Sequence, residues 1–328
     1  MKITAYEIRQ DEKPVFMKLA KELDLEITYL EEALSEQTVH LAAGSEGVII
    51  LGADVNAHVL QQLKALNINY IATRTVGYDH IDLVTAKELN IRISNASYGP
   101  DGVADFTIML ILMSLRKYKQ AMFRANVNDY SLKGLQGKEM KDLTIGIIGT
   151  GRIGAKVIEN LSGFGCRILA YDTFQNPRLH ESSTYVTLEE LYQQADVISL
   201  HIPLFESTAQ LINKDSLNKM KDGVILINCS RGELMNIPDL IEAIEHEKIG
   251  ALGLDVFENE SGIYHVDRRT EIIKNRDMAY IRQFPNVIMT QHMAFYTDAA
   301  VQDMVSCGLN SLVSFVKTGK AENEVANN

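Results

Sequence analysis

The hydrophobic positions of this chain fall into short runs that alternate with longer amphipathic stretches. In the first hundred residues, the strand-like runs are KITAYEI, LEITYL, EGVIIL, NYIATRTV and IRISNA. Helix-like patterns lie between them, for example over residues 55–66 and 82–89. Alternation of this kind favours a parallel sheet with helices on both faces. The sequence therefore predicts a first, open sheet of five strands.

The pattern changes close to residue 100. Pro100 and Asp101 mark a helix start, and apolar residues then recur to about Phe123, which predicts one long, largely buried helix. Residues 297–317 carry apolar side chains at steps of three and four, so they are predicted to form the last helix. The pattern alone does not decide which domain that helix joins. Between the two helices, a second alternating series runs through TIGII, RILAYD, DVISLHI, GVILINC, ALGLDVF and NVIMTQ.

The length and net charge of the chain narrow the classes of protein to which it can belong. A chain of 328 residues exceeds the roughly 250 to 300 residues that one core usually serves, so two domains are expected. The formal net charge of -11 opposes binding to nucleic acid or anionic lipid. The longest apolar-rich stretch, residues 106–115, is about half of the roughly 20 residues that a membrane span needs. Neither nucleic acid nor a membrane is therefore an expected partner.

The cysteines indicate the compartment. Cys166, Cys229 and Cys307 are odd in number and lack CxxC or metal-ligand spacing. The N-terminus has no apolar segment of the kind found in secretory signals. We therefore expect structural thiols in a reducing, cytoplasmic environment, and no metal site.

GTGRIG fits the GxGxxG pattern in a favourable context. The strand TIGII precedes it, a helical pattern follows, and Asp172 ends the next strand, RILAYD. This arrangement is the one that a dinucleotide-binding turn requires. Gly149 would permit the tight turn, Gly151 the approach of the pyrophosphate, and Gly154 close helix packing. A carboxylate at residue 172 would bind the ribose hydroxyls and repel a 2′-phosphate, which predicts NAD as the cofactor.

Three other strand endings carry candidate chemistry: NCSRGEL, LDVFENE and QHMAFYT. Ligands of doubly wound sheets bind beyond the carboxyl ends of the strands, so these endings can converge near the cofactor. Arg231 is suited to bind a carboxylate, and His292 to transfer a proton during hydride transfer. Local sequence does not separate Glu258 from Glu260 as its partner. His201, in SLHIPL, has almost the same strand-end setting as His292.

Over essentially its whole length, the chain resembles the D-isomer-specific 2-hydroxyacid dehydrogenase family. The resemblance rests on the order of GTGRIG, YD, HIPL, NCSRGEL, LDVFENE and QHMAFYT, preceded by TRTVGYDHID and SYGPDGVAD. The AFYT ending and the long insert after FENE look most like the D-lactate dehydrogenase branch, which includes D-2-hydroxyisocaproate and vancomycin-resistance dehydrogenases. One difference is Gln291, because the family usually has Pro, or sometimes Gly, before the histidine.

The resemblance implies roles for matching residues. Arg231 would bind the substrate carboxylate, Glu260 would partner the histidine, and His292 would be the acid/base. Further substrate contacts are implied for the backbone at Val76 and Gly77 and for the side chains of Tyr98 and Phe295. Cofactor contacts are implied for Gly149, Gly151, Arg152, Ile153, Gly154, Asp172, Pro203, Cys229 and Asp255.

The implied fold has two doubly wound parallel-sheet domains with a cleft between them. Residues 1–99 plus 297–328 would form a flavodoxin-like substrate domain, and residues 100–296 a Rossmann NAD-binding domain. The family typically forms a homodimer through the second domain.

The expected reaction is NADH-dependent reduction of pyruvate to D-lactate, with His292 kept protonated by anionic Glu260. Two alternatives stay open: a dehydrogenase for a larger 2-oxo acid, such as 2-oxoisocaproate or phenylpyruvate, and an NAD(H)-sensing corepressor-like binding protein.

Overall fold

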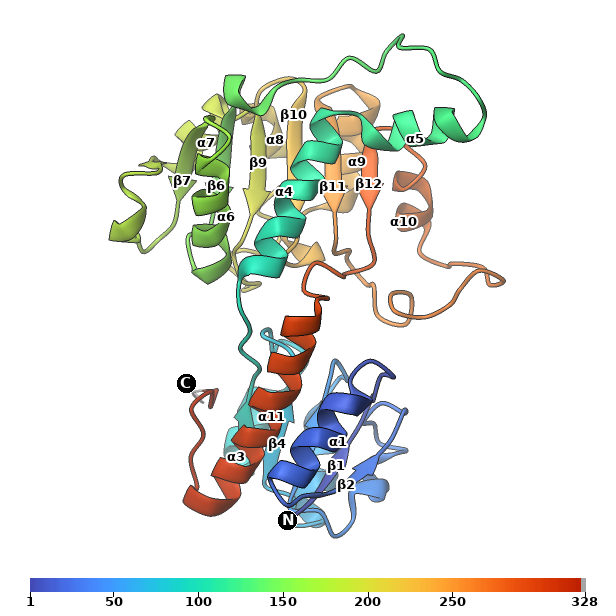
Figure 1. Ribbon diagram of the computed structural model, residues 1–328, viewed down its shortest axis with the longest axis vertical. Coiled ribbons are helices and arrows are strands. Elements are labelled where there is room, and N and C mark those ends of the chain that lie inside the picture. Colours follow the sequence, from blue (N-terminus) through green and yellow to red (C-terminus); the bar gives the residue numbers. More distant parts are fainter. Residues whose placement is uncertain (326–328) are drawn as a thin grey trace. The chain divides into compact units, whose positions relative to one another are not determined.

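The computed structural model describes residues 1–325 and separates into two compact units, each with its own sheet (Figure 1). Unit 1 contains Met1–Gly99 and the chain from Tyr296 onward, whereas unit 2 contains Pro100–Phe295. Both sheets have only parallel strand pairs. The predicted class, two α/β domains built on parallel sheets, is confirmed.

Unit 1 has a five-stranded sheet in the order β2-β1-β3-β4-β5, which is the flavodoxin-like order. Helices α2 and α3 cover one face, and helices α1 and α11 cover the other. The strands are β1 (Lys2–Ala5), β2 (Glu26–Tyr29), β3 (Gly47–Ile50), β4 (Tyr70–Thr73) and β5 (Arg92–Ser94). The helices are α1 (Lys13–Glu22), α2 (Ala57–Ala65), α3 (Leu83–Glu88) and α11 (Asp298–Thr318).

Helix α11 joins unit 1, which the sequence pattern could not decide. Thr297 caps it by accepting a hydrogen bond from the Ala300 amide at 3.2 Å. Its apolar face packs against β3 and β4 and beside α1 (Figure 1). Although α11 is long and apolar enough to span a membrane, 56% of its apolar window is buried, as in a core helix.

Unit 2 has a seven-stranded sheet in the order β12-β11-β10-β9-β6-β7-β8. Counted from β6, this is the Rossmann order with one further strand at the edge. The strands are β6 (Thr144–Ile148), β7 (Arg167–Tyr171), β8 (Thr184–Tyr185), β9 (Val197–Leu200), β10 (Val224–Asn228), β11 (Ile249–Leu254) and β12 (Val287–Met289). The two-residue strand β8 is too short to have been predicted from an alternating pattern.

Helices cover both faces of the unit 2 sheet. Helix α4 crosses one face next to α6 (Figure 1), and the helices α7 to α10 pack on the other. The helices are α4 (Asp101–Leu115), α5 (Tyr118–Asn126), α6 (Arg152–Ser162), α7 (Leu188–Gln194), α8 (Lys214–Lys219), α9 (Ile237–Glu245) and α10 (Arg276–Ile281).

The single long helix predicted from Pro100 to about Phe123 is wrong, because Lys117 divides it into α4 and α5. Lys117 has a left-handed backbone with φ of 49°, which ends α4 and turns the chain. The physical reason lies at Lys119, whose ammonium group holds α5 against the edge of the sheet. It donates hydrogen bonds of 2.7 to 2.8 Å to the carbonyl groups of Arg282, Phe284 and Val287.

A buried ion pair organises unit 1 at the end of β4. Arg74 and Glu12 have no exposed surface. The Arg74 Nε donates to Glu12 Oε1 at 2.9 Å, and Arg74 Nη2 also donates to the carbonyl oxygens of Tyr6 and Glu7 at 3.1 and 2.8 Å. The pair therefore ties the start of unit 1 to the strand that leads into Val76.

We expect Glu12→Gln to lower the free energy of unfolding of unit 1 by about 3 to 5 kcal/mol, because it removes the carboxylate that the buried guanidinium contacts. Urea denaturation measures this loss. The matched control is Glu31→Gln, which removes an exposed carboxylate paired with Lys13 and should change stability little. The double variant Glu12→Gln/Arg74→Met should lose less than the sum of the single variants. A loss below about 1 kcal/mol in Glu12→Gln would contradict the role of this pair.

Candidate active site

The glycine loop joins β6 to α6 and has the backbone shape that the motif predicts. Gly149 has φ of 95°, and a Cβ there would lie 2.4 Å from the carbonyl oxygen of His201. A Cβ on Gly154 would lie 1.9 Å from the Gly149 oxygen, whereas one on Gly151 would meet nothing within 4 Å. The first and third glycines are therefore required by packing, and the open side of Gly151 leaves the backbone accessible at the start of α6.

Asp172 follows β7 and faces this loop. Its carboxylate accepts hydrogen bonds from the Thr150 amide at 2.6 Å, the Thr150 hydroxyl at 3.1 Å and the Phe174 amide at 3.0 Å. Partial burial raises the pKa of Asp172, but the hydrogen bonds from Phe174 and Thr150 outweigh it, so the net pKa lies below the ordinary value. Asp172 is therefore an anion beside the glycine loop, as a ribose-binding carboxylate must be.

The other predicted cofactor residues surround the same strand ends. Arg152 and Ile153 begin α6, the exposed Pro203 lies beyond β9, and Cys229 directly follows β10. Burial raises the pKa of the Cys229 thiol and the nearby Asp255 raises it further, so this cysteine is a neutral thiol and not a nucleophile. Together with the open helix start and the Asp172 anion, this arrangement fits a bound dinucleotide.

Three neighbouring strands deliver the predicted catalytic side chains. Strands β10, β11 and β12 pair in parallel, with Asn228 opposite Leu254 and Leu254 opposite Met289 at their carboxyl ends. Their carboxyl ends therefore lie at one edge of the sheet, as the sequence analysis required. Arg231, Glu260 and His292 all follow these strand ends within unit 2.

Arg231 lies in a turn whose backbone is fixed by a buried side chain. Asn228 has no exposed surface, and its amide group donates to the Arg231 carbonyl at 2.7 Å and accepts from the Ser230 amide at 2.9 Å. Gly232 follows with no room for a side chain, because a Cβ would lie 2.2 Å from the Phe257 carbonyl carbon. The sequence NCSRG therefore folds as one rigid unit that holds Arg231 at the strand end.

His292 contacts the Glu260 carboxylate. Its Nδ1 donates to Glu260 Oε1, and Glu260 Oε2 accepts the Phe257 amide at 2.8 Å. The two side chains are 30% and 25% exposed, so solvent or a ligand can reach them. Of the two glutamates that local sequence left open, the structure places Glu260, and not Glu258, against the histidine. The pair has the geometry of a base and its orienting carboxylate.

Asp255 holds the turn that carries His292, a function that sequence reasoning missed. This aspartate has no exposed surface. Its carboxylate accepts hydrogen bonds from the Thr290 hydroxyl at 2.6 Å and from the amides of Met293 and Ala294 at 2.9 and 2.8 Å. Its backbone carbonyl accepts the His292 amide at 2.7 Å. The carboxylate of Asp255 therefore shapes the turn, and its expected contact with the cofactor stays a prediction.

His201, the rival candidate, has a different environment. Its Nε2 lies 2.9 Å from the Ser199 hydroxyl, and burial lowers the pKa of His201 to about 4. A histidine with this pKa is neutral near pH 7 and cannot serve as a ready proton donor there. Local sequence could not separate the two histidines, because the difference arises from burial and from the Glu260 contact; the family resemblance alone pointed to His292.

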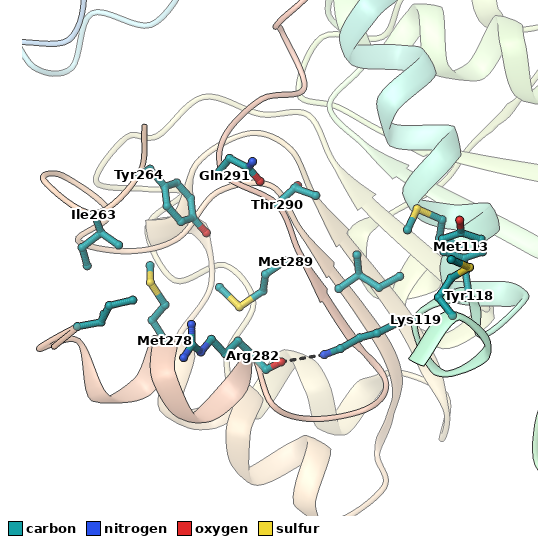
Figure 2. Close-up of a pocket in the computed structure, with 13 residues that line it drawn as sticks. Met113, Tyr118, Lys119, Ile263, Tyr264, Met278, Arg282, Met289, Thr290 and Gln291 are labelled. Atoms are coloured by element: carbon teal, nitrogen blue, oxygen red, sulfur yellow. Dashed lines mark hydrogen bonds between the residues drawn. The ribbon is translucent and has the colours of Figure 1, made fainter. Parts of the chain in front are cut away.

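Gln291, which replaces the family's usual proline, lines a cavity of about 510 Å³. Figure 2 shows Gln291, Thr290 and Tyr264 around it, above the apolar side chains of Met278 and Met289. The hydroxyl of Tyr264 is buried with no hydrogen-bond partner among residues 1–325. Because Asp255 fixes the turn through the amides after residue 291, the His292 backbone does not depend on a proline at this position.

The remaining predicted substrate residues are divided between the units. Val76, Gly77 and Tyr98 belong to unit 1 and Phe295 to unit 2. The Val76 and Gly77 carbonyl oxygens accept hydrogen bonds from Asn95 at 2.7 Å and from Thr75 at 2.6 Å. These carbonyl oxygens cannot bind a carboxylate, because both groups only accept hydrogen bonds, so the family's carboxylate contact at this loop would use the backbone amides. The Phe295 ring lies edge-on to the His292 ring at 6.2 Å.

Comparison with known proteins identifies the family. A sequence model described as "D-isomer specific 2-hydroxyacid dehydrogenase, NAD binding domain" matches residues 108–294. An aromatic 2-oxoacid reductase of Clostridium sporogenes is 41% identical over 327 residues, which cover 99% of both chains. A D-lactate dehydrogenase of Lactiplantibacillus plantarum is 37% identical over 329 residues, with 99% of both chains covered. The solved structure of a D-2-hydroxyisocaproate dehydrogenase has a TM-score of 0.89 at 34% identity and 99% coverage of both chains.

The match to the NAD-binding domain covers the glycine loop, Asp172 and the three strand ends, so the predicted cofactor is confirmed. The predicted resemblance is confirmed by relatives that align along nearly the whole chain. The chain therefore belongs to the D-isomer specific 2-hydroxyacid dehydrogenase family and is an NAD-dependent 2-hydroxyacid dehydrogenase.

Proposed function

We propose that the protein reduces a 2-oxo acid to the D-2-hydroxy acid with NADH, and that His292 donates the proton. The observation that carries this proposal is the contact between His292 Nδ1 and the Glu260 carboxylate. Because Nδ1 is engaged by Glu260, Nε2 is the nitrogen available to the substrate oxygen. The Glu260 carboxylate orients the ring through Nδ1, as a carboxylate beside an acid/base does.

The cofactor site contributes binding and orientation. The chemistry that bound NADH supplies is a hydride for the carbonyl carbon of the substrate. The open backbone at Gly151 and the first turn of α6 would bind the pyrophosphate, and Asp172 would bind the ribose hydroxyls. These residues lie at one strand end and one helix start. By binding the rest of the cofactor, they would set where its nicotinamide ring lies relative to the ends of β10 to β12.

Arg231 would bind the substrate carboxylate, because its guanidinium group can form two parallel hydrogen bonds to it. This charge also draws electrons from the adjacent carbonyl group and so favours attack by hydride. The rigid turn built by Asn228 and Gly232 supports this role. The substrate contacts of Val76, Gly77, Tyr98 and Phe295 stay predictions from the family resemblance.

Pyruvate is the substrate that we propose first, with D-lactate as product. This choice follows the resemblance to the D-lactate dehydrogenase branch and is supported by the relative from Lactiplantibacillus plantarum. A larger, aromatic 2-oxo acid is the second candidate, because the relative from Clostridium sporogenes, 41% identical, is an aromatic 2-oxoacid reductase.

We also propose a cytoplasmic homodimer. The three cysteines, Cys166, Cys229 and Cys307, are free thiols, which supports a reducing compartment. Exposed apolar side chains on α4 and α5 support association through unit 2. They are those of Met109, Tyr118, Met122 and Phe123, which are 39% to 69% exposed.

We expect His292→Ala and Glu260→Gln to lower kcat by about 100-fold or more while the Kd for NADH changes little, because they remove the proton donor or its partner. Stopped-flow and steady-state NADH oxidation measure turnover, and fluorescence titration measures NADH binding. Glu258→Gln is the matched control for the second variant and should retain turnover. Unchanged kcat in either test variant would remove the role assigned to that residue.

Arg231→Gln should raise the KM for the 2-oxo acid and lower kcat, because the carboxylate loses a bidentate charged partner. Steady-state kinetics at saturating NADH provide both constants. The control is Arg269→Gln, which removes an exposed arginine paired with Asp267. If KM and kcat both stayed at the wild-type values, Arg231 would not be the carboxylate anchor.

A substrate comparison tests the choice between pyruvate and a larger acid. We expect kcat/KM to be higher for pyruvate than for 2-oxoisocaproate or phenylpyruvate, measured by the loss of NADH absorbance under identical conditions. A higher value for phenylpyruvate would reject pyruvate in favour of the aromatic candidate, without affecting the assigned chemistry.

A further inference from the structure

The long insert after Glu260 brings a second histidine to the acid/base. His265 Nε2 lies 3.1 Å from the backbone carbonyl oxygen of His292. Because a carbonyl oxygen only accepts, Nε2 must carry the hydrogen and donate it. This contact joins the insert to the turn after β12, which lies 27 residues further along the chain. No role for His265 follows from the motifs that define the family resemblance.

The three rings of His265, His292 and Phe295 form one cluster. The ring centroids of His265 and His292 are 6.3 Å apart, and those of His265 and Phe295 are 6.4 Å apart. The ring of Phe295 is also edge-on to that of His292. The His265 ring therefore packs beside both the His292 ring and the Phe295 ring, and limits their movement toward it.

The backbone of His292 needs external support. Its φ is 51°, a left-handed backbone value that costs free energy for any residue with a Cβ. The His292 amide is held by the Asp255 carbonyl at 2.7 Å, and the His292 carbonyl is the group that His265 holds. One hydrogen bond therefore fixes each peptide group that flanks the acid/base.

The loop that carries His265 is itself well anchored. The amides of Ile263 and Tyr264 donate to the Glu260 carbonyl at 2.9 and 3.1 Å. Arg268 donates from Nε and Nη2 to the Gly262 carbonyl at 2.9 and 2.6 Å. Ile263 and Tyr264 pack on the core of unit 2. The same turn therefore presents Glu260 to the His292 ring and His265 to the His292 backbone.

We propose that His265 is a positioning residue for the reaction: its Nε2–H holds the His292 carbonyl and so keeps the imidazole aligned with Glu260 and the substrate oxygen. This inference rests on the proposed role of His292 as proton donor. His265 does not itself exchange the proton, because its hydrogen bond goes to the backbone and not to the imidazole. A small displacement of an acid/base is enough to slow proton transfer, since an error of about 1 Å can cost about 100-fold in rate.

Three substitutions separate the hydrogen bond from the ring. His265→Gln keeps an N–H donor at the same number of bonds from Cα as Nε2, but has no ring. His265→Phe keeps a ring without a donor. His265→Asn has a donor one bond too short, and asparagine also tolerates the left-handed φ of 61° at this position. A loss in His265→Asn therefore cannot be assigned to backbone strain. The control is His246→Asn, an exposed histidine at the end of α9.

The measurements are kcat, the KM for the 2-oxo acid, the Kd for NADH, and the isotope effect on kcat with NADH deuterated at the transferred position. We expect His265→Asn and His265→Phe to lower kcat about tenfold or more with the Kd for NADH unchanged. Their isotope effect should rise, because the chemical step becomes slower than product release. His265→Gln and His246→Asn should retain wild-type kcat and isotope effect.

The outcomes distinguish this inference from the proposed function. Wild-type protein that oxidises no NADH with any 2-oxo acid tested would reject the proposed function itself. An active wild type with unchanged kcat in His265→Asn and His265→Phe would overturn only the role of His265. Equal losses of kcat in His265→Asn, His265→Phe and His265→Gln would show that the hydrogen bond to the His292 carbonyl is not what sustains turnover. A lower kcat with an unchanged isotope effect would indicate a smaller folded fraction, and would also overturn the positioning role.

Discussion

The buried carboxylate of Asp255 is the constraint on which the catalytic end of unit 2 depends. It binds two successive backbone amides, those of Met293 and Ala294, together with the Thr290 hydroxyl. An anion with no exposed surface is stable only when hydrogen bonds replace its water, so the turn must keep this shape for the charge to stay buried. The left-handed backbone of His292 is held by the same residue. The position of His292, the proposed acid/base, therefore follows from the hydrogen bonds that the buried Asp255 carboxylate requires.

The end of β11 and the segment after it contribute most of the environment of His292. Asp255 fixes the backbone, Glu260 binds the ring and His265 binds the carbonyl, and all three lie within one stretch of chain. Arg231 is supplied by the neighbouring strand β10, through a turn that Asn228 and Gly232 make rigid. A parallel sheet allows this division, because neighbouring strands end at the same edge while their loops remain separate. The residues proposed to bind the carboxylate and to transfer the proton therefore lie on different loops.

Two cations of this protein, the buried Arg74 and the half-buried Lys119, are stabilised in different ways. In unit 1, Arg74 pairs with Glu12 and also donates to the Tyr6 and Glu7 carbonyl oxygens. In unit 2, the half-buried Lys119 donates to three backbone carbonyl groups. Burial lowers the pKa of Lys119, as desolvation of an ammonium group requires. Both groups join segments that are distant in the sequence.

The sequence by itself determined the five strands of unit 1, the glycine loop with Asp172, and the strand ends that carry Arg231 and His292. These features depend on local patterns of apolar residues and on glycines, two of which, Gly149 and Gly154, leave no room for a side chain. Local patterns leave open the unit that α11 joins, the glutamate that partners His292 and the contrast with His201, and the family resemblance implies an answer for each. Tertiary structure decided the break at Lys117 and supplied the contacts behind those answers. It also revealed the contact of His265. The physical reason is that these outcomes depend on burial and on hydrogen bonds between residues far apart in the chain, which local spacing does not record.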